Sequence, residues 1–94
     1  METKKNILSL EEFQKVISLI EEQDKRGGSD LLKHALFLTL NKMFNIRDED
    51  NIIGWWFEVK DKSDLYKTIS VEGGRSFIID TSEDLYNFLI NFYV

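Results

Sequence analysis

Hydrophobic and polar residues alternate most clearly in the middle of the chain, between residues 52 and 80. Successive side chains of a strand point to opposite faces, so a period of two indicates strands. The alternation divides into three runs, over residues 52–60, 65–71 and 76–80. If the first run is a strand, the residues on its apolar face are Ile53, Trp55, Phe57 and Val59. We therefore predict a three-stranded antiparallel meander with one strongly apolar face.

The loop between the second and third runs decides which side chains share a face. A two-residue Gly-Gly loop would pair Val71 with Ser76, whereas a three-residue loop would pair Val71 with Arg75. A shift of one residue moves a whole set of side chains to the other face, so only the longer loop places Ile69 opposite Phe77. Glycine at the end of this loop suits left-handed backbone. The pattern therefore favours the three-residue loop.

Helical periodicity precedes the meander. Ser9 and Glu12 have the spacing of a capping box, and the apolar residues that follow recur at helical spacing. Gly27-Gly28 would end this first helix, and a second helix is expected over residues 30–45. Because a short link joins antiparallel helices, we predict an N-terminal helical hairpin that follows a lead-in over residues 1–8.

The second predicted helix is apolar on almost every side, which is typical of a helix buried on more than one side. We expect it to pack between the first helix and the sheet. Thr81 and Asp84 repeat the capping pattern and begin a C-terminal helix. The core stripe of that helix contains Leu85, Phe88, Leu89 and Phe92. The predicted fold class is α+β, in the order α-α-β-β-β-α, as a single compact domain over residues 1–94.

Composition agrees with an ordinary globular domain, because 43% of the 94 residues are hydrophobic and 31% are charged. The absence of cysteine excludes disulfides and Cys-based zinc sites. No apolar run approaches the roughly 20 residues that cross a bilayer, so we expect a cytoplasmic protein without signal peptide or membrane contact. The residues expected in the core are Leu36, Leu40, Trp55, Phe57, Ile69, Phe77, Leu85, Phe88 and Leu89.

Charge and motifs narrow the chemistry further. The net charge of −5 disfavours direct nucleic-acid binding, which needs clustered Lys and Arg, but permits a basic protein partner. His34 is the only histidine, and no second histidine or cysteine accompanies it as a metal ligand. Residues 48–51 lack the spacing of a calcium loop, and residues 72–75 lack the Lys-Ser/Thr of a phosphate-binding loop. We therefore expect neither an enzyme nor a metal or other cofactor.

Residues 36–56 read LFLTLNKMFNIRDEDNIIGWW, and GGRSFIID and LYNFLINFYV follow later. Together they loosely resemble the opening of a heat-shock-factor-type winged-helix DNA-binding domain. That family also has a helix, a polar loop, an Ile-Ile-x-Trp-like strand, a Gly-Ser-Phe strand and a helix ending in Tyr-Phe. Here an extra segment over about 57–71 separates the two strands, and the sequence ends before the position of the basic recognition helix. With the acidic net charge, we interpret the resemblance as a chance pattern.

Two classes of function fit these patterns. Trp56 alternates with the expected core residues, so it should be exposed on the opposite face of the meander, and exposed aromatic residues at rigid positions are typical anchors of interfaces. We hypothesise a small acidic, non-enzymatic domain that inhibits or antagonises a larger protein, with basic nucleic-acid-handling proteins among the candidates. Phage anti-defence and toxin-immunity proteins have a similar size and charge. The alternative is a structural or assembly subunit that forms a homodimer or larger homo-oligomer. The residues expected to bind the partner are Trp56, Glu58, Tyr66, Tyr86, Ile90 and Tyr93.

Overall fold

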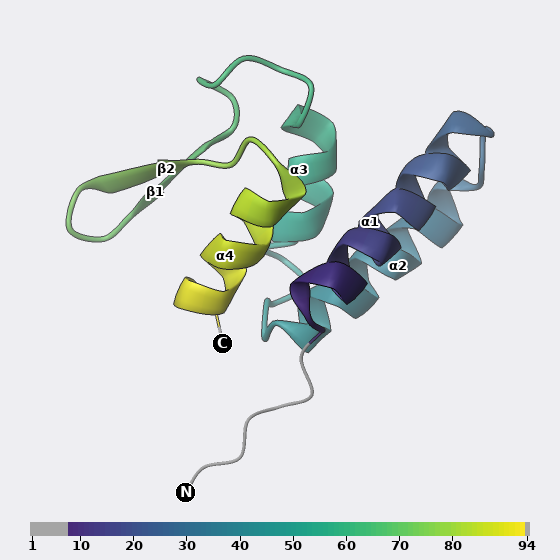
Figure 1. Ribbon diagram of the computed structural model, residues 1–94, viewed down its shortest axis with the longest axis horizontal. Coiled ribbons are helices and arrows are strands. Elements are labelled where there is room, and N and C mark those ends of the chain that lie inside the picture. The colour runs from purple at the N-terminus through teal and green to yellow at the C-terminus, as the bar shows by residue number, and fades with distance from the viewer. Residues whose placement is uncertain (1–7, 94) are drawn as a thin grey trace, which may run out of the picture.

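The computed structural model describes residues 8–93, which contain four helices and one two-stranded antiparallel sheet (Figure 1). The fold class is therefore α+β. The predicted lead-in over residues 1–8 lies outside the described residues except for Leu8. In chain order the elements are α1 (Leu10–Lys25), α2 (Asp30–Met43), α3 (Ile52–Val59), β1 (Thr68–Val71), β2 (Arg75–Ile78) and α4 (Ser82–Phe92).

The N-terminal helical hairpin forms as predicted, with α1 and α2 side by side (Figure 1). The Ser9 hydroxyl accepts a hydrogen bond from the Glu12 N–H, and the Glu12 carboxylate accepts one from the Ser9 N–H, which confirms the capping box. Gly27 takes a positive φ of 72° after α1, a backbone that glycine adopts without strain. The Ser29 hydroxyl then caps α2.

The prediction of the first strand of the meander is wrong, because residues 52–59 form helix α3. The run IIGWWFEV is apolar at every position but Glu58, and such a short run fits a strand and a helix equally well. The helical reading places Ile53, Trp56 and Val59 on one face, and these three side chains are buried. Asn51 caps this helix with its side chain, a signal that favoured a helix over the predicted strand.

The remaining two strands pair in the predicted register, with Ile69 opposite Phe77 and Val71 opposite Arg75. The three-residue loop is confirmed, and its Gly73-Gly74 pair has φ values of 90° and 81°. Both values lie in the left-handed region, which suits glycine. The hairpin projects away from the α1–α2 pair and rests beside α4 (Figure 1).

Two details of the predicted apolar face of the sheet differ. Leu65 lies in the turn before β1 and is 81% exposed, because the chain is not yet extended at that position. Lys67, which interrupts the apolar pattern, is buried instead. Its Nζ lies 2.5 Å from Asp80 Oδ1 and 3.7 Å from Asp64 Oδ1, so the ammonium group remains paired.

The core lies between the four helices, and it is centred on aromatic rings. Phe13 and Phe44 are fully buried and meet edge to face, with ring centroids 5.5 Å apart. Of the predicted core residues, those that are buried are Leu40, Leu85, Phe88 and Leu89. Those that pack against the core while partly exposed are Leu36, Trp55, Phe57, Ile69 and Phe77.

Helix α2 does not pack between α1 and the sheet as predicted. It packs against α1 and α3, and the hairpin lies on the far side of α3 and α4 (Figure 1). The outer side of α2 is therefore uncovered, and Leu31 and Leu32 are 79% and 47% exposed. The extra apolar residues of this helix thus reach the surface.

Candidate functional site

Trp56, the predicted anchor of the partner-binding surface, is only 3% exposed. Its indole Nε1–H donates a hydrogen bond to the backbone oxygen of Ile79 at 3.2 Å, so the side chain ties α3 to the end of the hairpin. The prediction of exposure failed because it assumed a strand, in which neighbouring residues point to opposite faces. In helix α3 it is Trp55 that reaches the surface and Trp56 that faces the core.

The predicted stripe of Tyr86, Ile90 and Tyr93 does not escape the core, because all three side chains pack against it. The Tyr86 hydroxyl donates to the Leu8 backbone oxygen at 2.7 Å, and its ring lies 5.4 Å from that of Phe13. Burial raises the pKa of the Tyr93 phenol. Helix α4 packs against α1 on one side and the hairpin on another, so it buries more than one stripe.

Glu58 and Tyr66 are exposed, as predicted, but they belong to different parts of the surface. Tyr66 is 58% exposed in the turn before β1, where the Lys62 ammonium group lies 5.5 Å from its ring centroid. Glu58 lines a cleft between α2 and α3. The six predicted residues therefore do not form one surface, and of the six it is Glu58 that lines the α2–α3 cleft.

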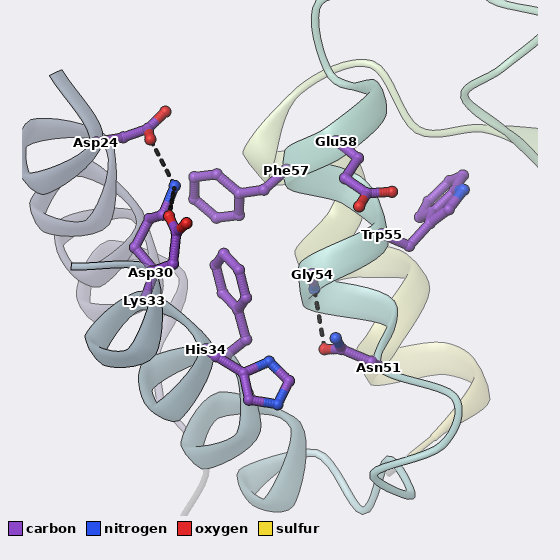
Figure 2. A pocket seen from close by; sticks show the side chains of 10 residues that line it. Asp24, Asp30, Lys33, His34, Asn51, Gly54, Trp55, Phe57 and Glu58 are labelled. Carbon is purple, nitrogen blue, oxygen red and sulfur yellow. Dashed lines mark hydrogen bonds and ion pairs between the residues drawn. The ribbon is translucent and has the colours of Figure 1, made fainter. Parts of the chain in front are cut away.

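The α2–α3 cleft has a volume of about 460 Å³, within the range of roughly 300–1,000 Å³ that is typical of ligand sites. Figure 2 shows Phe57 of α3 pointing toward α2, and Asp24 of α1 meeting Lys33 at the rim of the cleft. The residues that line it are Asp24, Asp30, Lys33, His34, Phe37, Asn51, Gly54, Trp55, Phe57 and Glu58. The four lining residues of α2 share one helix face, because they recur at i, i+3, i+4 and i+7.

The apolar part of the cleft is aromatic. The rings of Phe37 on α2 and Phe57 on α3 lie 5.1 Å apart at an interplanar angle of 30°. Both rings and that of Trp55 are partly exposed, so they present apolar surface to a ligand. In Figure 2 Phe57 and Trp55 lie on either side of Glu58, which places a carboxylate between two aromatic side chains.

The polar rim of the cleft contains one ion-paired cation. Lys33 Nζ lies 2.6 Å from Asp24 Oδ1 and 3.6 Å from Asp30 Oδ1. The hydrogen bond with Asp24 raises the pKa of Lys33, and the same bond lowers the pKa of Asp24. Both groups are therefore held in their charged forms around neutral pH. Because this ammonium group already has two carboxylate partners, it adds little positive charge to the rim.

Two asparagines link α2 to α3 at one end of the cleft. Fully buried Asn41 of α2 donates from Nδ2 to Asn51 Oδ1 at 2.7 Å, and its own Oδ1 accepts from the Ile53 N–H at 3.3 Å. Asn51 Oδ1 also accepts from the Gly54 N–H at 3.1 Å. A Cβ atom at Gly54 would lie 2.4 Å from Asn51 Nδ2, so any larger residue would have to displace the Asn51 side chain. This network joins the end of α2 to the start of α3.

The sequence contained signals for this cleft that the strand prediction obscured. A helical reading of residues 52–59 would have placed Trp55 and Glu58 on one face, three residues apart. Asn51 before an apolar run is the expected N-cap of such a helix. Asn41 carried no comparable signal, because a polar residue inside a helix is more often exposed than buried.

The side chains of the cleft can bind a ligand by ring stacking, ion pairing and hydrogen bonding. Within residues 8–93, no three His, Asp or Glu side chains gather as a metal site would require. Over the same part of the chain, no helix has both the length and the apolar character needed to span a membrane. Comparison of the chain with protein families, with curated proteins and with solved structures gave no match.

Proposed function

We propose that this protein is a non-enzymatic protein-binding domain whose α2–α3 cleft docks a segment of a larger, basic protein and thereby antagonises that protein. The observation that carries the proposal is the cleft itself, in which partly exposed aromatic rings lie beside carboxylates on two joined helices. Aromatic side chains at rigid positions are the usual anchors of protein interfaces. The role proposed from the sequence for Trp56 passes to Trp55.

Charge favours a basic partner. The protein carries a net charge of −5, which repels nucleic acid and attracts clusters of Lys and Arg. A nucleic-acid-handling protein uses such clusters to contact phosphates. An acidic domain that covers one of these clusters would block those contacts, which is the form of antagonism that we propose.

Site-directed photo-cross-linking in cells of the source organism tests this proposal. A benzoylphenylalanine at position 34, on the exposed rim of the cleft, should yield a discrete cross-linked protein. The same group at position 72, in the exposed hairpin loop, serves as the control and should not yield it. Trp55→Ala should lower the yield strongly, since the loss of an interface anchor costs about 2 kcal/mol or more. Equal products from both positions would contradict the proposal.

Self-association is a second candidate, favoured by a separate apolar surface. Ile78 of β2 is 50% exposed and Phe92 of α4 is 38% exposed, and they line a shallow cavity of about 190 Å³. Among the described residues, β2 pairs only with β1, so its other edge is open to a further strand. Sedimentation at several concentrations should then show a dimer that Ile78→Lys weakens. A monomer at all concentrations would exclude this candidate.

A further inference from the structure

The carboxylates of the α2–α3 cleft exceed its ammonium groups by two. The single ammonium group, that of Lys33, is already held by Asp24 and Asp30. Among the residues that the structure describes, Glu58 has no ion-pair partner. Its exposed carboxylate is therefore available to a positive charge that enters the cleft.

The indole ring of Trp55, close to Glu58 on α3, is a second group available to a ligand. The two residues lie three positions apart on α3, and both line the cleft. In Figure 2 the Trp55 side chain extends past Glu58 on the side away from α2, at the outer edge of the cleft. Within residues 8–93, no aromatic ring and no cationic group lies over the Trp55 indole. By contrast, Phe57 already has Phe37 beside it and the Lys60 ammonium group 5.9 Å from its centroid. Tryptophan is the best aromatic partner for a cation.

From this pair we infer that the cleft binds an arginine side chain in the basic segment of the partner, an inference that rests on the proposed function. The guanidinium group would stack on the Trp55 indole and donate two parallel hydrogen bonds to the Glu58 carboxylate. A guanidinium is planar, weakly hydrated and able to form such a fork, whereas a lysine ammonium group is a compact, strongly hydrated charge. The aliphatic stem of the arginine would lie against the phenylalanine rings of the cleft.

The surface beside the cleft favours a peptide segment over free arginine. Asp30 lines the cleft, and the next residue of α2, Leu31, is 79% exposed. Ala35 lies one helical turn further along the same face and is also exposed. Apolar residues next to the arginine would bury this surface and gain affinity that the free amino acid cannot gain.

A titration followed by nuclear magnetic resonance tests the inference with defined probes. The probes are acetyl-Leu-Arg-Leu-amide and the same peptide with citrulline, an uncharged isostere of arginine, or with lysine. The arginine peptide should shift the Trp55 indole N–H and the Gly54 amide N–H saturably. The Trp56 indole N–H is an internal control, because it is buried and bonded to Ile79. The lysine peptide should bind about fivefold more weakly, and the citrulline peptide should not saturate.

Two matched variants locate the charge that is recognised. Glu58→Gln should weaken the arginine peptide about tenfold, because it removes the ionised acceptor and keeps the shape of the side chain. Glu72→Gln makes the same chemical change in the exposed hairpin loop and should leave the affinity unaltered. Equal affinity for the arginine and citrulline peptides, or an equal loss in both variants, would overturn the inference.

The remaining outcomes separate this inference from the proposed function. Free L-arginine that binds as tightly as the peptide would reject a protein segment as the source of the guanidinium. A cross-linked protein at position 34 without any binding of the arginine peptide would reject arginine recognition and keep the protein-binding function. Saturable peptide binding without a cross-linked protein would keep arginine recognition and reject that function in the cells tested.

Discussion

At the residue scale, two adjacent tryptophans of α3 have opposite environments. Trp56 is buried and bonded through its indole N–H, whereas Trp55 lines the cleft and is partly exposed. A buried polar group without a partner is expensive, so the hydrogen bond to the Ile79 oxygen matters more for stability than an exposed contact does. We therefore expect Trp56 to contribute mainly to stability and Trp55 mainly to binding.

Trp56→Phe should lower the free energy of unfolding by about 1–3 kcal/mol, because it leaves the buried Ile79 oxygen unpaired and removes part of a packed ring. Trp55→Phe is the matched control and should change stability by about 0.5 kcal/mol or less. Urea denaturation followed by circular dichroism measures both values. Similar losses for the two variants would show that the burial of Trp56 is not what holds α3 in place.

At the element scale, the contact between α2 and α3 depends on a glycine. Gly54→Ala should destabilise the protein by about 1–3 kcal/mol, since a Cβ atom there meets the Asn51 side chain at 2.4 Å. Asn51→Ser shortens that side chain and keeps an N-cap oxygen. The double variant should therefore lose less stability than the sum of the two single variants. Additive losses in thermal denaturation would argue against this clash.

The same scale shows how far the sequence predicts the fold. The helix caps at Ser9 and Thr81 were readable because each depends on residues within one turn. The hairpin register was readable because only one loop length brings the apolar side chains together. Helix α3 could not be predicted in this way, because the run from Ile52 has apolar residues on nearly all sides and its period is ambiguous.

The candidate site was less predictable than the fold. Glu58 was correctly expected to be exposed, but its neighbours in space come from α2, and their position depends on the buried Asn41 network. Once residues 52–59 are taken as a strand, Trp55 is assigned to the core and Trp56 to the surface. The wrong assignment of residues 52–59 therefore reversed the predicted environments of the two tryptophans, and the cleft was not predicted.

At the scale of the whole molecule, an ion pair between Lys67 and Asp80 joins the turn before the hairpin to the segment between β2 and α4. The hydrogen bond that the Lys67 ammonium group donates to Asp80 raises the pKa of Lys67, so the folded state favours the charged lysine more than the unfolded chain does. This stabilisation is complete below the ordinary lysine pKa of about 10.4 and is lost as the pH rises through the higher folded value. The free energy of unfolding should therefore fall at alkaline pH, once the pH exceeds the ordinary lysine pKa.

Lys67→Met tests this pH dependence. The free energy of unfolding of the native protein, relative to the variant, should stay constant from pH 7 to about pH 10 and then fall. Other titrating groups are present in both proteins and cancel in the difference. Lys15→Met, which removes an exposed lysine from α1, controls for the loss of one surface charge. A difference that stays flat up to pH 12 would mean that the pair with Asp80 is not formed in solution.

The packing of α4 over the N-terminal aromatic pair has a consequence for synthesis on the ribosome. Tyr86 lies 5.4 Å from the Phe13 ring and 6.0 Å from the Phe44 ring, and Leu85 and Leu89 beside it are fully buried. Chains emerge N-terminus first, so α1, α2 and α3 can form while this aromatic surface is still uncovered. The nascent protein therefore passes through an aggregation-prone stage, in which three helices expose apolar surface until α4 leaves the exit tunnel.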